Sequence, residues 1–282
     1  MATFLDTLGL RRLERRLGFR RRQVETSHGM ATALVGHGDG DGPPLVMLHG
    51  VGSRGTHYAR IVERMLPRLG PVVLPDFLGH GLSGEPSARN VQVLVDGMTE
   101  TLDQVVDEPY VMFGNSMGGY GALKVAARRP ERVRGVIVNS PAGGKLDDAT
   151  REVVLQRLRI RSHADALNLV DITFARPPMR HVVAWAVRKQ LTVPEIRTII
   201  ESVGAQDDLD PDELARLSMP VKVLWGDAEG LLDPQQLAWL RDAMPAHAAF
   251  EEPEGFGHSP YVDRPAELAD RILSFFADHG NR

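Results

Sequence analysis

The stretch that decides the fold class is YVMFGNSMGG, residues 110–119. Its first four residues form a short apolar run, which predicts a buried strand. Apolar residues three or four positions apart in 118–129 predict a helix directly after it. Gly114 and Gly118 bracket Ser116, and small residues of this kind fit a tight turn from strand to helix. The stretch therefore predicts a strand, a sharp turn and a helix, with Ser116 at the apex.

The same alternation of short apolar runs and helical stretches continues on both sides. This order of elements is typical of an α/β fold whose mostly parallel sheet is covered by crossover helices. Strand-like alternation in 24–35 predicts an antiparallel hairpin where the chain enters the sheet. The expected strands are 45–49, 72–75, 110–114, 133–139, 221–225 and 248–251. The expected helices are 58–69, 91–106, 118–129, 235–244 and 265–277.

Three parts of the chain are expected. Residues 1–22 contain seven arginines between positions 11 and 22 and leucines at helical spacing, which predicts a basic amphipathic helix. Residues 23–142 and 205–282 are expected to form one α/β core. Between them the alternation stops, and 143–204 is predominantly helical in pattern, which predicts a cap inserted over the sheet.

Composition limits the possible partners. The chain has 282 residues, 33 Lys and Arg against 37 Asp and Glu, a net charge of -4 and no cysteine. This balance does not favour nucleic acid as a partner, and the absence of cysteine excludes disulfides and thiolate metal sites. No apolar run approaches a bilayer span, and no secretory signal pattern stands at the N-terminus. We expect a cytoplasmic protein, with peripheral membrane contact through the basic N-terminal helix as an option.

Ser116 is the candidate nucleophile. A serine at a helix N-terminus lies where the helix dipole favours negative charge, and the N–H of Met117 can then stabilise an oxyanion. The second amide is expected from Val51, in the loop HGVGS that follows the strand at 45–49. His49 also stands in this loop, where a histidine beside a glycine turn is expected mainly to position the chain.

A serine hydroxyl needs a base with a pKa near neutrality, which indicates histidine. Of the ten histidines, His258 is the best candidate, since it stands in the glycine-rich segment GFGHSP before the last helix. It also completes the chain order of nucleophile, acid and base that this arrangement requires.

Three carboxylates compete for the role of the acid. Glu229, Asp233 and Asp227 all stand in the loop GDAEGLLDP, which follows the strand at 221–225. Either Asp or Glu can accept a hydrogen bond from the histidine and stabilise the imidazolium. We favour Glu229, with Asp233 second because it stands before Pro234 in a good helix N-cap position, and Asp227 third.

These motifs together resemble the α/β-hydrolase family from about residue 45 to 276. The matching segments are MLHGVG (47–52), LPDFLGHGLS (74–83), GNSMGGYGALKVAARRPERV (114–133), VLWGDAEGLLDP (223–234) and GFGHSPYVDRP (255–265). With NSPAGG and FARPP, the chain looks most like the bacterial lipase and acylglycerol-hydrolase branch. In that branch the acid stands three residues past the strand-ending glycine and is usually Asp; here the position is Glu229.

The resemblance implies a serine hydrolase that cleaves carboxylic esters of small molecules through an acyl-enzyme. Its triad would be Ser116, His258 and Glu229, the amides of Val51 and Met117 would form the oxyanion hole, and no metal or organic cofactor is implied. The expected substrate pocket is lined by residues of the oxyanion loop and the cap, namely His49, Gly50, Phe174, Met179 and Trp185.

Two alternatives remain. Carbon–carbon bond hydrolases of the same fold share GNSMGG, but they usually have Trp after the catalytic histidine, where this chain has Ser259. A non-catalytic, ligand-binding member of the fold is the other alternative, although such a protein is expected to lack part of the triad.

Overall fold

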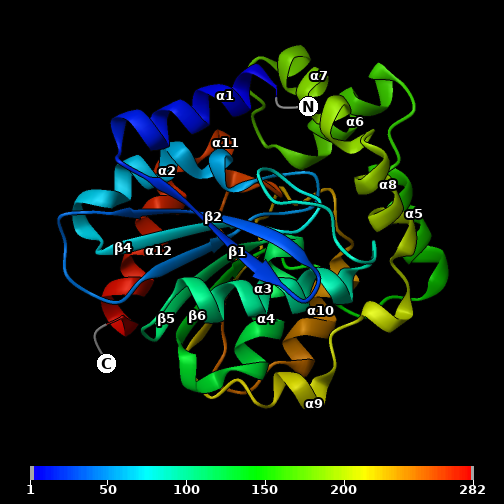
Figure 1. Ribbon diagram of the computed structural model, residues 1–282. Coiled ribbons are helices and arrows are strands. Elements are labelled where there is room, and N and C mark those ends of the chain that lie inside the picture. The colour runs from blue at the N-terminus through cyan, green and yellow to red at the C-terminus, as the bar shows by residue number, and fades with distance from the viewer. Residues whose placement is uncertain (1–2, 281–282) are drawn as a thin grey trace.

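A computed structural model describes residues 3–280, which form an eight-stranded sheet with helices on both faces (Figure 1). The strand order is β1-β2-β4-β3-β5-β6-β7-β8, with β1, β2 and β4 joined antiparallel and all later neighbours parallel. The strands are β1 (Arg20–Thr26), β2 (Gly29–His37), β3 (Leu45–Leu48), β4 (Pro71–Asp76), β5 (Tyr110–Asn115), β6 (Val133–Asn139), β7 (Val221–Leu224) and β8 (Ala249–Glu251). The expected α/β class, entry hairpin and parallel sheet are confirmed.

Two layers of helices explain why the central strands are continuously apolar. Every residue of β3 and of β5 is buried, because helices cover both faces of the sheet. One face packs against α2 (Ala59–Met65) and α12 (Pro265–His279), and the other against α3 (Val91–Val105) and α4 (Met117–Arg128). The remaining core helices are α9 (Pro211–Leu214), α10 (Pro234–Ala243) and α11 (Pro260–Asp263), with short turns η2 (Gly55–Tyr58), η3 (Leu66–Arg68), η4 (Pro130–Arg132) and η5 (Ala205–Asp207).

Of the helices between β6 and β7, four α-helices fall within the expected cap, 143–204. They cover the right-hand and upper side of the sheet in Figure 1. α6 and α7 pack closely on one another, and α5 and α8 connect them to the core. The four are α5 (Asp148–Leu158), α6 (His163–Thr173), α7 (Arg180–Leu191) and α8 (Pro194–Ser202).

The N-terminal segment differs from the helix expected over 1–22. Helical structure consists of α1 (Phe4–Arg11) and the π-helical turn η1 (Arg12–Arg16), and Arg20–Thr26 forms the edge strand β1 instead. β1 pairs with β2 along its whole length, from Arg20 opposite Val35 to Thr26 opposite Gly29. The arginine-rich composition continues from η1 into β1, so it does not reveal where the helix ends and the strand begins. Sequence pattern alone also cannot show that an edge of β2 is available for pairing with β1. Within residues 3–280, no helix is both long and apolar enough to cross a bilayer.

Candidate active site

Ser116 lies at the sharp turn between β5 and α4. Its backbone has φ 59° and ψ -122°, a conformation that non-glycine residues rarely adopt. The turn depends on Gly118, because a Cβ there would lie 2.1 Å from the carbonyl oxygen of Leu48 on β3. Strained backbone of this kind persists only where the surrounding structure enforces it, and it is concentrated at functional sites. The turn presents the Ser116 side chain to a cavity at the N-terminus of α4.

His258 and Glu229 form a buried pair beside this cavity. The Nδ1 of His258 lies 2.8 Å from Oε2 of Glu229, and the two side chains are 5% and 1% exposed. The other carboxylate oxygen, Oε1, accepts hydrogen bonds from the backbone N–H groups of Leu231 and Leu232, at 2.8 and 3.0 Å. Both oxygens of Glu229 are therefore held, which fixes the orientation of the His258 ring. His258 and Ser116 line the same cavity.

The environment of Glu229 favours its ionised form. Burial by itself raises the pKa of this carboxyl group, but the charge and hydrogen bond of His258 lower it. The Ser140 hydroxyl and the N–H of Leu232 lower it further, and the net pKa of Glu229 lies below its ordinary value of 4.5. An ionised Glu229 can stabilise a positive charge on His258 during catalysis.

The two other carboxylates of this loop have structural contacts. Asp233 is the N-cap of α10, and its Oδ1 accepts from the N–H of Gln235 at 3.0 Å. Asp227 accepts from the N–H of Gly255 at 2.6 Å and connects the two loops. Of the three candidates for the acid, Glu229 is the one whose carboxylate contacts His258.

Two asparagines that the sequence did not single out hold the His258 loop. The side-chain amides of Asn115 and Asn139 both donate to the carbonyl oxygen of His258, at 2.9 and 3.1 Å. They stand opposite one another at the ends of β5 and β6 and are fully buried. Their positions in the sequence could have indicated this role, because polar residues that end neighbouring parallel strands meet at one edge of the sheet.

The loop after β3 passes close to Ser116. A Cβ on Gly50 would lie 3.2 Å from the Cβ of Ser116, so glycine allows this close approach. Val51 follows and lines the cavity. On the other side of Ser116, Met117 is the first residue of α4, and its N–H has no acceptor within the helix. The amides of Val51 and Met117 are therefore the candidates for an oxyanion hole.

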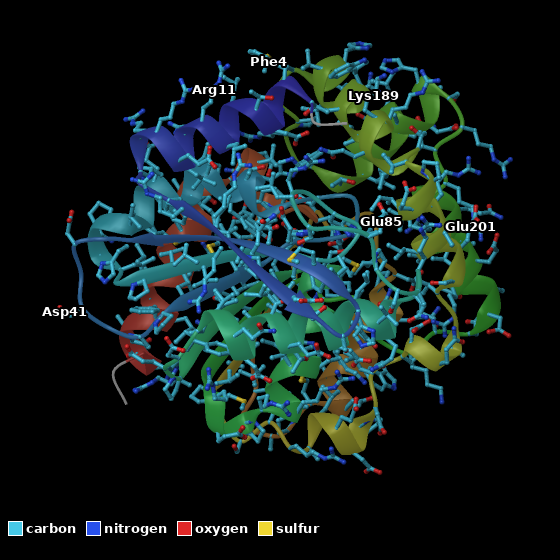
Figure 2. The ribbon with its side chains drawn as sticks, in the orientation of Figure 1. Phe4, Arg11, Asp41, Glu85, Lys189 and Glu201 are labelled. Carbon is cyan, nitrogen blue, oxygen red and sulfur yellow. The ribbon has the colours of Figure 1, made fainter. Side chains whose placement is uncertain are left out.

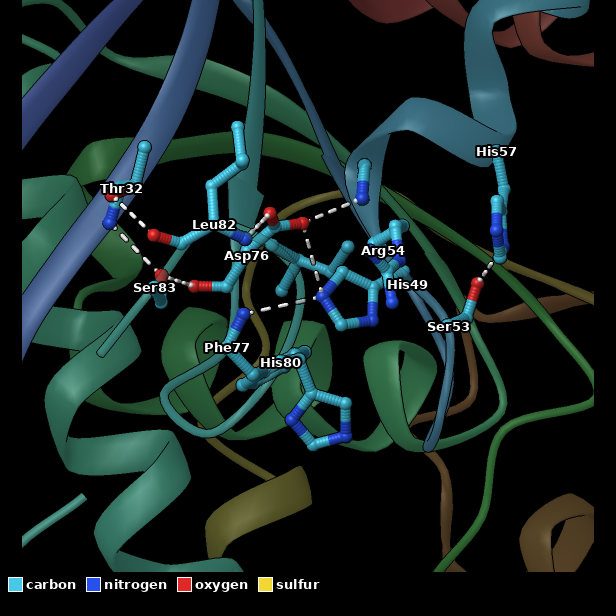
Figure 3. Close-up of polar contacts among 12 residues, drawn as sticks. Thr32, His49, Ser53, Arg54, His57, Asp76, Phe77, His80, Leu82 and Ser83 are labelled. Atoms are coloured by element: carbon cyan, nitrogen blue, oxygen red, sulfur yellow. Dashed lines mark hydrogen bonds and ion pairs between the residues drawn. The ribbon is translucent and has the colours of Figure 1, made fainter. Parts of the chain in front are cut away.

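His49, expected in the pocket lining, lies beneath the loop instead (Figure 3). It is fully buried, its Nε2 accepts from the N–H of Phe77 at 3.2 Å, and its Nδ1 then donates to the carbonyl of Gly50 at 2.9 Å. Burial holds the pKa of His49 well below 6.5. His49 is therefore a neutral residue that positions the loop. Asp76, beside it in Figure 3, similarly accepts from the N–H groups of Gly55 and Leu82.

The main cavity has a volume of about 410 Å³ and reaches from Ser116 to the surface between the cap and the N-terminal helix. Of the expected lining residues, Gly50, Phe174 and Met179 contribute to its wall. Trp185 does not, because it projects from the outer side of α7 and is 45% exposed. Leu8 of α1 contributes instead, which the sequence did not indicate.

A smaller, mainly apolar chamber of about 120 Å³ also reaches Ser116. The two spaces share four lining residues, so they meet at the serine: Val51, Ser116, Leu158 and Leu231. Side chains from α4, α5 and α8 form the far wall of the smaller chamber. Residues 3–280 contain no cluster of three or more His, Asp or Glu side chains placed to bind a metal ion.

Comparison with known proteins places the chain in a family. Residues 44–265 match the family model described as serine aminopeptidase, S33. The chain belongs to this family of α/β hydrolases. A solved structure of a bacterial membrane phospholipase A superimposes with a TM-score of 0.82, covering 97% of this chain and 92% of the other at 24% identity.

Two curated relatives are similar in sequence. The pimeloyl-[acyl-carrier protein] methyl ester esterase of Yersinia enterocolitica is 29% identical over 256 residues, covering 86% of this chain and 95% of the relative. The 2-hydroxymuconate semialdehyde hydrolase of Pseudomonas sp. strain CF600 is 40% identical over 119 residues, 41% of each chain. The chain is thus a hydrolase of the α/β fold with esterase relatives.

Proposed function

We propose that this protein hydrolyses carboxylic esters with Ser116 as nucleophile, His258 as base and Glu229 as acid. The observation that carries the proposal is the buried His258–Glu229 pair at 2.8 Å, which faces the same cavity as the strained Ser116 turn. A serine, a histidine and an orienting carboxylate arranged in this way activate a hydroxyl for acyl transfer.

Each step of the reaction has a group to perform it. Ser116 Oγ attacks the ester carbonyl carbon and its proton passes to Nε2 of His258, while the N–H groups of Val51 and Met117 stabilise the oxyanion. The intermediate collapses, and the alcohol leaves with the proton from His258. A water molecule, deprotonated by His258, then attacks the acyl-enzyme and releases the carboxylic acid and free Ser116.

The charge of the cavity supports an ester rather than a peptide with a free amino terminus. Among the described residues, no Asp or Glu side chain lines the main cavity, while Arg12, Arg60 and His57 do. Binding of a substrate ammonium group inside a cavity requires a carboxylate or another acceptor of comparable strength. The lining of the main cavity therefore suits neutral or anionic groups, whereas the smaller chamber is also lined by Asp207 and by Asp208, which pairs with Arg151.

The main cavity and the smaller chamber, which meet at Ser116, suggest where the two parts of an ester substrate bind. One part of the substrate would occupy the smaller chamber, beside Val154 and Ile200, and the other part would extend into the main cavity beside Phe174. The second candidate activity, carbon–carbon bond hydrolysis, is supported by the local similarity to the 2-hydroxymuconate semialdehyde hydrolase. It would use the same serine and histidine.

The test is the initial rate of hydrolysis of p-nitrophenyl esters of increasing acyl length. We expect turnover by the wild-type protein, its loss in Ser116→Ala, and its retention in Ser53→Ala, a second serine of the same cavity. Val154→Trp, which fills the smaller chamber, should shift the preferred acyl length. Folded wild-type protein that turns over no ester, but cleaves a vinylogous 1,5-diketone, would favour the carbon–carbon hydrolase; absence of both activities would favour a binding role.

A further inference from the structure

Large apolar side chains are exposed mainly on two helices. Of the seven such side chains among the described residues, five lie on α1 or at α7. Their exposed fractions range from 45% to 70%, whereas scattered exposed apolar residues normally occur singly. The five are Phe4, Leu8, Met179, Val182 and Trp185, which we call the apolar rim.

The apolar rim lies beside the opening of the main cavity. Leu8 and Met179 are both exposed and both line the cavity, so α1 and α7 face each other across its mouth. Figure 1 shows the two helices side by side at the top of the molecule. A ligand that reaches Ser116 by this route must pass the apolar rim.

Basic side chains continue from the apolar rim on both helices. The outward face of α1 carries Phe4 and Leu8 and then Arg11, at helical spacing, and the outward face of α7 carries Trp185 and then Lys189. Phe4, Arg11 and Lys189 project from the same upper surface in Figure 2.

This surface is basic although the whole chain is acidic. The elements α1, η1 and α7 together contain seven Lys or Arg and two acidic residues, against a net charge of -4 for the chain. Of the two acidic residues, Asp6 is buried and Glu14 pairs with Arg21 at 2.6 Å. Three of the seven basic residues are also ion-paired, Arg12 and Arg16 with Glu63 and Arg180 with Asp171. The positive charge presented to solvent here is therefore carried by Arg11, Arg15, Arg188 and Lys189.

A polar network fixes the two helices. Asp6 of α1 lies 2.8 Å from Nε2 of His57 and 3.2 Å from Nε of Arg54, both in the segment that follows the Val51 loop. It also accepts from the side-chain amide of Gln190 on α7, at 3.4 Å. α1 is thus anchored to the core and to the cap, and the apolar rim is held in one geometry.

We propose that the apolar rim, together with the basic residues Arg11 and Lys189 that continue from it, is a docking surface for an anionic lipid bilayer. Docking there places the mouth of the cavity at the membrane. Amphipathic helices bind such interfaces by inserting apolar side chains, while Lys and Arg are attracted to anionic headgroups. Two helices that each change from apolar to basic along one face, around the entrance of an apolar cavity, fit this occupant. The proposal goes beyond ester hydrolysis, because docking requires no turnover.

The test uses full-length Ser116→Ala protein and two kinds of vesicle, phosphatidylcholine alone and an equimolar mixture with phosphatidylglycerol. We expect cosedimentation with the mixed vesicles only, and a blue shift of tryptophan emission that Trp185→Phe removes. Of the three tryptophans, Trp185 is the exposed one, since Trp225 is buried in the core and Trp239 is half-buried on α10. Because the protein is inactive, failure of docking is distinguishable from failure of the proposed hydrolysis.

Matched variants separate the surface from general effects. Phe4→Ser with Trp185→Ser should weaken partitioning about tenfold or more. The control, Met30→Ser with Val153→Ser, removes the two exposed apolar residues outside the rim and should leave partitioning unchanged.

A second pair of variants tests the charge. Arg188→Glu with Lys189→Glu should abolish the preference for mixed vesicles, whereas Arg68→Glu with Lys145→Glu, equal in charge and placed elsewhere, should retain it. The proposal would be overturned if both pairs of charge variants lost vesicle binding equally, or if folded protein did not bind mixed vesicles. It would also be overturned by a dimer in sedimentation equilibrium that Phe4→Ser with Trp185→Ser dissociates.

Discussion

The cavity is bordered by two sets of serine, histidine and carboxylate, and only one has the geometry of a nucleophile. In the first, Nδ1 of His258 lies 2.8 Å from Glu229. In the second, Nε2 of His57 lies 2.8 Å from Asp6, and its Nδ1 accepts from the Ser53 hydroxyl at 2.8 Å (Figure 3). Both sets contain the same functional groups, and in both a histidine nitrogen lies 2.8 Å from a carboxylate oxygen.

Backbone position distinguishes the two serines. Ser116 has a strained, positive φ at the N-terminus of the twelve-residue helix α4, beside the backbone amides of Val51 and Met117, the candidates for an oxyanion hole. Ser53 precedes only the four-residue turn η2, and its hydroxyl is used between His57 and the buried Tyr261. Hydrogen-bonded residues alone therefore do not define a catalytic triad; the helix terminus and oxyanion donors complete it.

The second set, Ser53, His57 and Asp6, has a structural role. It connects α1, the loop after Val51 and α7 through Asp6, His57 and Gln190. These parts form the mouth of the cavity, whereas the first set lies at its base on loops from β5, β7 and β8. Changes at the first set should therefore affect turnover, and changes at the second set should affect the stability of the fold.

The largest expected effect is that of Glu229→Gln. A glutamine amide cannot stabilise the imidazolium and can favour the wrong tautomer of His258, so kcat should fall on the order of 10⁴-fold, the size found when a triad loses its carboxylate. Steady-state ester hydrolysis measures it. Asp233→Asn in the same loop is the control: it removes a carboxylate charge, but the asparagine oxygen can still accept the N-cap hydrogen bond from Gln235, so kcat should be retained.

A smaller effect is expected from Asp6→Asn. This change removes the charge that pairs with His57 and Arg54 and weakens the capping box with Thr3. The free energy of unfolding should fall by about 2 kcal/mol, the contribution of a hydrogen bond to a charged group. Chemical denaturation measures it. A fall in kcat as large as that of Glu229→Gln, with unchanged stability, would contradict the structural role.

The smallest expected effect is the pH dependence of the difference in unfolding free energy between the wild-type protein and Asp6→Asn. Burial raises the pKa of Asp6, but His57, Thr3 and Arg54 lower it. The net pKa of Asp6 lies well below 3.8. The carboxylate therefore stabilises the fold fully above its unfolded pKa and progressively less as the pH falls below about 4. The stability gap between wild type and Asp6→Asn should narrow on acidification; a gap that widens below pH 4 would give the opposite sign.

Much of the fold and the core of the site could be predicted because the signals are local. The stretch 110–119 contains the strand, the turn and the helix start, and the parallel sheet follows from the repetition of this pattern. Glu229 could be ranked above Asp233 because Asp233 stands at a helix N-cap position, and because Glu229 stands three residues past the strand-ending glycine, where the family that the chain resembles has its acid.

The rest depends on contacts between distant segments. Asp6 and His57 are 51 residues apart, and no spacing rule relates α1 to the Val51 loop. The contribution of Leu8 to the cavity and the outward position of Trp185 depend on how α1 and α7 pack, which periodicity does not specify. The strand β1 was hidden for the same reason, since its partner β2 determines its conformation.

The role of Ser116 as nucleophile can be tested by covalent labelling with an activated fluorophosphonate, followed by mapping of the modified peptide by mass spectrometry. We expect one adduct, on Ser116, which is lost in Ser116→Ala and retained in Ser53→Ala. An adduct on Ser53, or no adduct on folded wild-type protein, would contradict the assignment of Ser116 as the nucleophile.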